Sequence, residues 1–149
     1  MKTISIINLK GGVGKTTTAL AMAWLISEKQ GKSILMVDND KQGNASRMMG
    51  LYRRQVPGGT SRMMRNREAW NYIENTRYSK IYMLTCNMFM EREEKEVLMD
   101  RNSTQHDRYR TALQKVKEYF DYCIIDNPPD LGISVINALT ASDDIIIPV

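Results

Sequence analysis

The chain contains the stretch Lys10-Gly11-Gly12-Val13-Gly14-Lys15-Thr16-Thr17 between a short apolar run and a segment with helical spacing. A strand, a glycine-rich loop and a helix in this order form a cradle for phosphate groups. The glycines let successive backbone N–H groups turn inward, and the helix N-terminus adds a positive field. Lys15 is then expected to reach the terminal phosphates, and the Thr16 hydroxyl is expected to ligate Mg²⁺. A glycine-rich turn without nucleotide is the alternative, and the flanking strand and helix favour the phosphate loop.

The composition is that of a soluble globular domain, since 42% of the 149 residues are hydrophobic and 26% are charged. We assign residues 1–149 to a single domain. The sequence shows no leader and no apolar run of membrane-spanning length, which predicts a cytoplasmic protein without a membrane partner. Its two cysteines, Cys86 and Cys123, do not make a disulfide framework, and Cys123 is expected to lie in the core.

Apolar runs alternate with segments of helical spacing along the chain. The expected strands cover residues 4–9, 33–37, 81–85, 122–125 and 145–147, and the expected helices cover residues 16–29, 70–73, 90–99, 108–120 and 134–141. Residues 41–80 are difficult to assign, because Pro57-Gly58-Gly59 interrupts them. Strands that are separated by helices and are apolar almost throughout predict an α/β fold. In this fold, helices cover both faces of a parallel sheet of about five strands.

The last expected strand runs almost to Val149. An all-isoleucine strand at this place would leave an exposed, aggregation-prone sheet edge. We therefore expect the domain to be incomplete at its C-terminal end. Either the 149 residues are the N-terminal part of a longer architecture, or a partner chain supplies the missing elements.

Acidic residues follow two of the expected strands. Asp38 and Asp40 come directly after the second strand, and Asp126 comes directly after the fourth. Parallel strands present their C-terminal ends on one side of the sheet, so these carboxylates should converge on the glycine loop after the first strand. An apolar strand that ends in Asp is the Walker B arrangement, whose carboxylate holds Mg²⁺ or its waters. Any one of these residues alone could instead cap a loop, but three acidic residues after two strands, beside a phosphate loop after a third, favour a nucleotide site.

Four segments resemble those of the ParA/MinD family of dimerising ATPases, and together they span nearly the whole chain. The stretch from Lys10 to Thr17 resembles the deviant Walker A motif, which has a second lysine at the head of the loop. Residues 37–45, Val37-Asp38-Asn39-Asp40-Lys41-Gln42-Gly43-Asn44-Ala45, are similar to the Walker A′ segment. Residues 120–129, Phe120-Asp121-Tyr122-Cys123-Ile124-Ile125-Asp126-Asn127-Pro128-Pro129, are similar to the Walker B and switch region. Asn137-Ala138-Leu139, followed by Ala141, Asp143 and Ile147-Pro148-Val149, matches the segment that comes next in the family. Gln42-Gly43-Asn44 and the double proline favour the ParA branch over the MinD branch. The resemblance implies a P-loop ATPase domain.

The chain departs from the family pattern at three positions. Leu9 replaces the polar or glycine residue that is usual before the signature lysine, Lys41 stands where proline is common, and Asn127 follows the Walker B aspartate. None of these changes removes a group that is expected to touch phosphate or metal. Nucleotide binding is therefore still expected, whereas the rate of ATP turnover is left open.

The resemblance implies a role for each residue of the site. The nucleotide would be bound by Lys10, Gly11, Gly12, Val13, Gly14, Lys15, Thr16 and Thr17. Mg²⁺ and its water shell would be held by Thr16, Asp38 and Asp126. The catalytic residues would be Lys15 at the β/γ-phosphates, Asp40 at the attacking water, and Lys10, which would cross to the nucleotide of the other subunit of a dimer.

The implied function is that of a ParA-like ATPase in chromosome or plasmid partitioning. Such a protein binds ATP and Mg²⁺, forms a homodimer, and hydrolyses ATP to switch its affinity for non-specific DNA at the nucleoid and for a ParB-like stimulating protein. Between Lys41 and Lys80 the chain has nine Lys and Arg residues against Glu68 and Glu74. This stretch could contact DNA or could be a solvated face.

Three alternatives remain open. A MinD-like positioning ATPase would need a C-terminal amphipathic helix, which these 149 residues do not contain. An iron–sulfur or electron-carrier ATPase of the nitrogenase iron protein type would need cysteines after the Walker B aspartate, whereas Cys123 precedes Asp126. A scaffold that binds nucleotide without hydrolysing it also agrees with the motifs. The preference for ATP over GTP rests on the resemblance alone.

Overall fold

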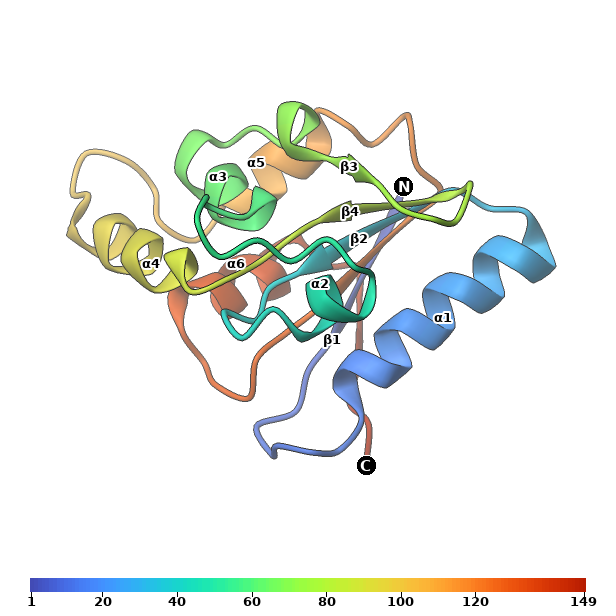
Figure 1. The fold of residues 1–149 in the computed structure, drawn as a ribbon. Helices are drawn as coiled ribbons and strands as arrows, with labels where there is room; N and C mark the ends of the chain where they lie inside the picture. Colours follow the sequence, from blue (N-terminus) through green and yellow to red (C-terminus); the bar gives the residue numbers. More distant parts are fainter.

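A single six-stranded sheet forms the centre of the computed structural model, which describes residues 1–149 (Figure 1). Its strands lie in the order β3-β4-β2-β5-β1-β6. They are β1 (Lys2–Ile6), β2 (Ile34–Asp38), β3 (Glu74–Asn75), β4 (Ile81–Leu84), β5 (Tyr122–Asp126) and β6 (Asp144–Ile146). Five strands run parallel, which confirms the predicted α/β class, and β3 pairs antiparallel with the edge of β4.

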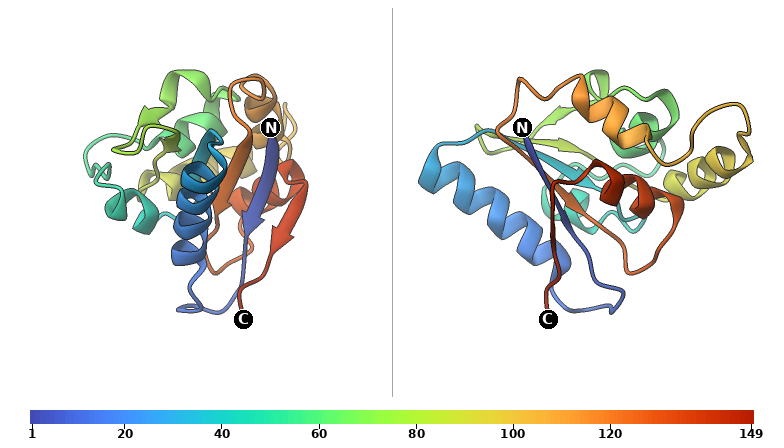
Figure 2. Two further views of the ribbon diagram at one scale, coloured as in Figure 1. Left: turned by 90° about the vertical axis from the view of Figure 1, so that its right-hand side faces the viewer. Right: turned by 180° about the vertical axis from the view of Figure 1, so that it is seen from behind.

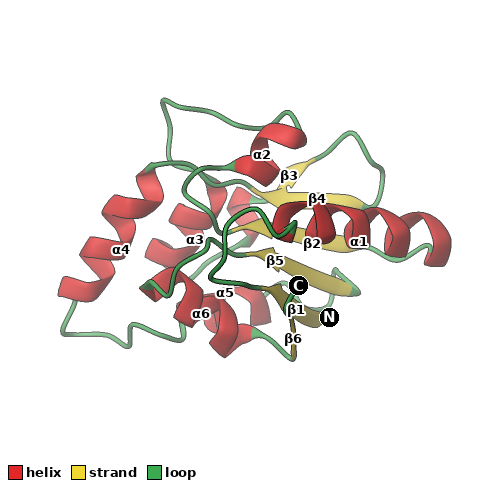
Figure 3. Ribbon diagram, turned by 90° about the horizontal axis from the view of Figure 1, so that it is seen from below, coloured by secondary structure: helices red, strands yellow, loops and turns green.

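Helices cover both faces of this sheet (Figures 1 and 3). One face carries α1 (Lys15–Gln30) and α2 (Asn44–Met48). The opposite face carries α3 (Gly59–Asn66), α4 (Phe89–Met99), α5 (Arg108–Gln114) and α6 (Ile133–Ala141). A short 3₁₀ turn, η1 (Trp70–Tyr72), leads into β3.

Two separate cores result from the alternation of side chains along the strands. In β2, Ile34 and Met36 pack on the side of α1, whereas Leu35 and Val37 pack on the side of α3 to α6. All four side chains are fully buried. A central parallel strand must therefore be apolar at every position, which is why these strands read as continuous apolar runs in the sequence.

Several predicted boundaries are corrected by the structure. The first strand ends at Ile6 and not at residue 9, because the chain leaves the sheet there to form the glycine loop. The helix predicted over 108–120 ends at Gln114, and a series of turns covers residues 115–119. The stretch that is difficult to assign holds α2, α3 and β3, which are five, eight and two residues long. Elements this short leave too few turns or alternations for a periodic signal.

The end of the chain lies beside the glycine loop. Strand β6 pairs with β1 and forms one edge of the sheet, with Ile145 half-exposed. Beyond it, the Asn8 side-chain amide donates to the Pro148 carbonyl at 2.7 Å, and Figure 2 shows the C-terminus next to this loop. The predicted exposed isoleucine edge is thus present in the structure. Among the helices, none has both the length and the apolar character that a membrane crossing needs.

We expect Ile124→Ala to lower the free energy of unfolding by about 2–5 kcal/mol, because Ile124 is fully buried in one of the two central strands of the sheet and the truncation leaves a cavity. The matched control, Ile145→Ala on the exposed edge, should cost less than about 1 kcal/mol. Urea denaturation measures both values. Equal losses for the two variants would contradict the proposed location of the core.

Candidate functional site

Three neighbouring strands deliver the predicted site residues to one edge of the sheet. In the order β2-β5-β1, Asp38 is aligned with Asp126, and Asp126 is aligned with Ile6. The glycine loop begins at Lys10, four residues after Ile6, and Asp40 lies two residues beyond the end of β2. The structure therefore brings together the loop and the acidic segments, as the parallel arrangement predicts.

The glycine loop is open toward solvent and shaped by two left-handed glycines. Gly12 and Gly14 have φ angles of 72° and 85°, a region that other residues rarely adopt. An added Cβ at either glycine would have no heavy atom within 4 Å, so space for a ligand lies above the loop. No side chain caps the start of α1, which leaves its first N–H groups available to an anion.

Lys15 begins α1 and is almost completely buried within the loop, with 8% of its surface exposed. Its ammonium group donates to the Lys10 carbonyl at 3.1 Å, which folds the side chain back over the glycines. The Lys10 backbone N–H in turn donates to the Asn8 side chain at 2.9 Å. The Lys10 side chain is exposed at the head of the loop, and Val13 is half-buried.

A cavity of about 810 Å³ lies over the loop. This volume is within the usual range for a small-molecule site, roughly 300–1,000 Å³. Its lining consists mostly of polar residues and glycines, together with Met48 and two prolines. The walls come from three parts of the chain. They are Gly11, Gly12, Gly14, Lys15, Thr16 and Thr17 from the loop and α1; Asp40, Lys41, Gln42, Asn44, Arg47 and Met48 from the segment after β2; and Pro128, Pro129 and Asp130 from the segment after β5.

Asp126 is a buried carboxylate without a hydrogen-bond partner on either oxygen. Burial raises its pKa to about 6, and the nearby charge of Asp40 adds to this. The Thr16 hydroxyl, which lies close by without hydrogen-bond geometry, and the Lys15 ammonium oppose the rise. A buried, unpaired carboxylate is costly unless a cation or donor completes it. Its place beside Thr16 therefore fits a divalent cation.

The metal site would not be built from protein groups alone, because no cluster of three or more His, Cys, Asp or Glu side chains is present. This agrees with Mg²⁺, which usually takes one or two carboxylates together with water and substrate phosphates. Thr16 lines the cavity and would supply the hydroxyl ligand. The residues present thus fit Mg²⁺ bound jointly with a phosphate group.

Asp38 lies behind the cavity, and its oxygens are already engaged. Its Oδ2 accepts the Ser46 hydroxyl at 2.6 Å and the Ser46 N–H at 2.8 Å, and its Oδ1 accepts the Asp40 N–H at 3.1 Å. Burial raises its pKa to about 7, which the Ser46 hydroxyl opposes and the Asp126 charge reinforces. The structure shows Asp38 organising the segment that carries Asp40, and its role as a metal ligand stays a prediction.

Asp40 itself lines the cavity, which is where a residue that orients water would have to be. One of its oxygens accepts the Gln42 N–H at 2.9 Å. Arg47 also lines the cavity and stacks on the Tyr52 ring at 3.6 Å from the ring centroid. The sequence does not mark Arg47 as a site residue, because α2 is only five residues long and gives no periodic signal that would place it beside the loop.

Neither of the two cysteines lines the cavity. Cys86 and Cys123 are both free and buried, and burial raises the pKa of each thiol. Cys123 lies within β5, as predicted, and its thiol packs in the core on the side of α3 to α6. Neither position suits a shared iron–sulfur cluster at a subunit surface.

Fold and site together define a P-loop nucleotide-binding domain, with the glycine loop between β1 and α1 and carboxylates after the two adjacent strands. A family model described as an AAA domain matches residues 1–149, and the chain belongs to this family. Its similarity to ParA-type relatives confirms the resemblance to the ParA/MinD family that the motifs indicate.

Two relatives illustrate this similarity. The chain is 36% identical over 149 residues to the sporulation initiation inhibitor protein Soj of Bacillus subtilis (strain 168), and it covers 58% of that protein's length. It is 34% identical over 146 residues to the chromosome partitioning protein ParA of Myxococcus xanthus (strain DK1622), of which it covers 50%. The chain thus spans about half the length of the curated relatives it matches.

Solved structures show the same fold. A cobyrinic acid a,c-diamide synthase from Mycobacterium smegmatis, with a bound ATP analogue and magnesium, has a TM-score of 0.89 and 30% identity. The match covers 100% of this chain and 60% of that one. An ATP complex of a variant of Cyanothece McdA has a TM-score of 0.88 and 26% identity, over 99% of this chain and 56% of that one.

We expect Asp126→Asn to stabilise the nucleotide-free protein, and more so at pH 8 than at pH 4. The pKa of Asp126 is about 6 in the folded protein, against 3.8 for an ordinary aspartate. Between these two pH values the folded protein therefore binds more protons than the unfolded chain does. Wild-type stability should therefore fall as pH rises from about 4 to about 6, and this loss persists at higher pH. The gain at pH 8 should be on the order of 1–3 kcal/mol.

Chemical denaturation in EDTA at pH 4, 6 and 8 measures this effect. The control is Asp130→Asn, since Asp130 is exposed in the same segment. A gain for Asp126→Asn that is the same at all three pH values would contradict the raised pKa.

Proposed function

We propose that this chain is the nucleotide-binding part of a ParA-like ATPase, which binds ATP with Mg²⁺, dimerises and hydrolyses the nucleotide. One observation carries the proposal. The unpaired buried carboxylate of Asp126 lies close to Thr16 and Lys15, at the base of a glycine loop with open space above it. A fold tolerates an unsatisfied group of this kind where a ligand completes it.

The loop binds the triphosphate through its geometry. Backbone N–H groups and the uncapped start of α1 face the β- and γ-phosphates, and Lys15 adds a positive charge. Thr16 and Asp126 would hold Mg²⁺, with Asp38 behind them. Charge neutralisation on the phosphates is the chemistry that bound Mg²⁺ supplies. The ATP- and magnesium-bound structures of similar proteins support this choice of ligands.

Asp40 and Lys10 are the proposed catalytic groups besides Lys15. Asp40 lines the cavity, where its carboxylate would orient the attacking water or accept its proton. Lys10 is exposed and would reach the nucleotide of a second subunit, as the family resemblance implies. A cation supplied in trans is worth on the order of 10³–10⁵ in rate in related systems, so an isolated subunit would be nearly inactive.

Partners and location are proposed at the level of the family. The named relatives Soj and ParA support a role in partitioning, with an ATP-bound homodimer, non-specific DNA and a ParB-like stimulating protein as partners in the cytoplasm at the nucleoid. A MinD-like positioning ATPase is the second candidate from the same fold. The buried thiols disfavour the iron–sulfur carrier.

We expect the specific ATPase rate to rise with protein concentration and to lose this dependence in Lys10→Ala, because the missing cation comes from the second subunit. Lys29→Ala is the matched control, since Lys29 is exposed at the far end of α1. Steady-state phosphate release measures the rate, and binding of a fluorescent ATP analogue measures affinity. A wild-type rate that does not depend on concentration would reject the trans mechanism, and an absence of ATP binding would reject the proposed function.

Ion pairs within the fold reduce the number of basic side chains between Lys41 and Lys80 that are free to contact DNA. Arg53 pairs with Glu74 at 2.5 Å, Arg67 pairs with Asp107 at 3.2 Å, and Arg65 pairs with Glu93 and Glu96. Arg54 and Arg77 are exposed and have no ion pair in the structure. These two residues are therefore better candidates for phosphate contacts than their paired neighbours.

If this stretch contributes to DNA binding, affinity for duplex DNA in the presence of ATP should fall steeply between about 50 and 200 mM salt, because phosphate contacts release counterions. Arg54→Ala combined with Arg77→Ala should reduce the slope of log affinity against log salt by roughly two, in proportion to the lost contacts. Arg65→Ala serves as the comparison. Binding that is insensitive to salt, or absent, would reject this surface.

A further inference from the structure

A chain of buried hydrogen bonds connects the three strand ends of the site. The Tyr109 hydroxyl donates to Asn39 Oδ1 at 2.6 Å, and Asn39 Nδ2 donates to Asn127 Oδ1 at 2.8 Å. Asn127 Nδ2 then donates to the Ile6 carbonyl at 3.1 Å. Tyr109, Asn39 and Asn127 are all essentially inaccessible to solvent. We call this series the amide chain.

Each strand-end member of the amide chain adjoins a part of the proposed site. Asn39 lies between Asp38 and Asp40, Asn127 follows Asp126, and Ile6 is the last residue of β1 before the glycine loop. The backbone adds a direct connection, since the Asn39 N–H donates to the Asp126 carbonyl at 2.9 Å. The spacing between the Asp40 segment, Asp126 and the loop thus depends on two side-chain amides.

The polarity of the amide chain is set at one end by the Ile6 carbonyl, which can only accept a hydrogen bond. Asn127 must therefore present its NH₂ group to Ile6, which leaves its oxygen to accept from the Asn39 NH₂ group. The Asn39 oxygen is then left to accept from the Tyr109 hydroxyl. Burial holds the pKa of this phenol well above its usual value, so the hydroxyl keeps the proton that it donates.

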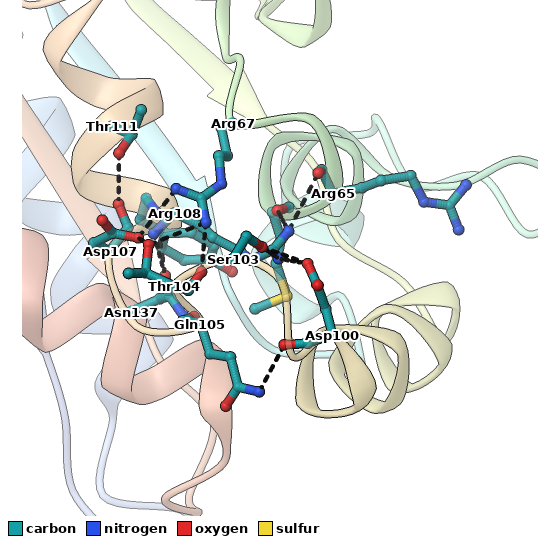
Figure 4. A network of polar contacts seen from close by, with 12 residues as sticks. Arg65, Arg67, Asp100, Ser103, Thr104, Gln105, Asp107, Arg108, Thr111 and Asn137 are labelled. Carbon is teal, nitrogen blue, oxygen red and sulfur yellow. Dashed lines mark hydrogen bonds and ion pairs between the residues drawn. The ribbon is translucent and has the colours of Figure 1, made fainter.

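Tyr109 is itself anchored to the helix that follows the site. The Asn137 side-chain oxygen in α6 accepts the N–H groups of Arg108 and Tyr109 at 2.8 and 3.3 Å. The neighbouring guanidinium of Arg108 is buried and donates to Asp100 Oδ2 and Ser103 Oγ, both at 2.7 Å (Figure 4). The start of α5 is therefore held firmly on two sides.

These contacts close a ring through the cavity wall. The segment after β5 begins with Asn127, continues through Pro128, Pro129 and Asp130 along the cavity, and enters α6. Asn137 of α6 then holds Tyr109, whose hydroxyl returns through Asn39 to Asn127. If the Tyr109 ring only filled space in the core, a phenylalanine would serve equally well. The hydrogen bond from its hydroxyl to Asn39 therefore needs an explanation besides packing.

We infer that Tyr109 is a positioning residue for ATP hydrolysis, whose hydroxyl orients Asn39 and, through Asn127, sets the position of Asp40 relative to Asp126. This inference rests on the proposed function. Tyr109 is too deeply buried to touch the nucleotide, so it acts on the catalytic step only through the amide chain. This inference also explains why the chain departs from the family pattern at Asn127, since the amide of Asn127 is the hydrogen-bond partner of Asn39.

The test compares Tyr109→Phe with Tyr72→Phe. Tyr72 also has a hydrogen-bonded hydroxyl, which accepts from Asn66 at 2.6 Å, but it lies outside the cavity wall and the amide chain. Tyr109→Phe is expected to lower kcat about tenfold, the effect of one unsatisfied buried oxygen that disturbs the transition state. Its KM for ATP should stay within about twofold of wild type, because the glycine loop is not altered. Tyr72→Phe should leave both constants unchanged.

A second variant tests whether Tyr109 acts through Asn39. In the background of Asn39→Ala, the hydroxyl has no amide to orient, so adding Tyr109→Phe should lower kcat no further than about twofold. A full additional loss of about tenfold in that background would overturn the inference, because the two residues would then act independently. Unchanged kcat in Tyr109→Phe alone would overturn it as well.

Hydrogen exchange in the absence of nucleotide provides a readout that does not depend on activity. Tyr109→Phe should accelerate exchange in peptides that cover residues 39–42 and 126–130, with α1 as an unchanged reference. Faster exchange throughout the molecule would indicate a merely structural role and would overturn the inference. If the wild-type chain fails to bind ATP, the proposed function is rejected, whereas this exchange pattern still decides whether the amide chain positions the two segments.

Discussion

Parallel pairing of β2, β5 and β1 is the constraint on which the site depends, since it makes three chain segments leave the sheet side by side. The segments that follow these strands then have no alternative but to share one edge. The same pairing places Asp38 opposite Asp126 in a buried environment, where each carboxylate faces both desolvation and a like charge. The unfavourable burial of charged groups is therefore confined to this edge, and the rest of the sheet is apolar.

The two buried carboxylates at this edge, Asp38 and Asp126, differ in their hydrogen-bond partners. Ser46 and the Asp40 N–H satisfy the oxygens of Asp38, whereas those of Asp126 have no protein partner. An acid that is satisfied within the protein organises structure, and an acid that is left unsatisfied is completed by a ligand. The difference arises from α2, because Ser46, one of its two buried residues, places its hydroxyl 2.6 Å from Asp38 Oδ2.

The two faces of the sheet serve different purposes. The face under α1 is mainly an apolar core, in which Ala19 and Ala23 let the helix approach the strands, and Ser46 of α2 makes its polar contact to the end of β2. The opposite face mixes apolar packing with polar contacts that reach the strand ends. Thr60 of α3 donates to the Asp38 carbonyl at 2.7 Å, and Tyr109 of α5 donates to Asn39. Movements of the helices on that face would therefore shift residues of the site, because buried polar networks have few alternative arrangements.

The sequence by itself determined the α/β class, the five parallel strands and the identity of the glycine loop, because buried strands and the phosphate loop have strong local signals. It also predicted that Asp38, Asp40 and Asp126 would meet, since strand ends in a parallel sheet share one edge. Only the tertiary structure decided which of these carboxylates is satisfied, which arginines are paired within the fold, and that Asn39, Asn127 and Tyr109 form one chain. Those outcomes depend on contacts between residues as many as 88 positions apart, as for Asn39 and Asn127, and such contacts leave no periodic trace in the sequence.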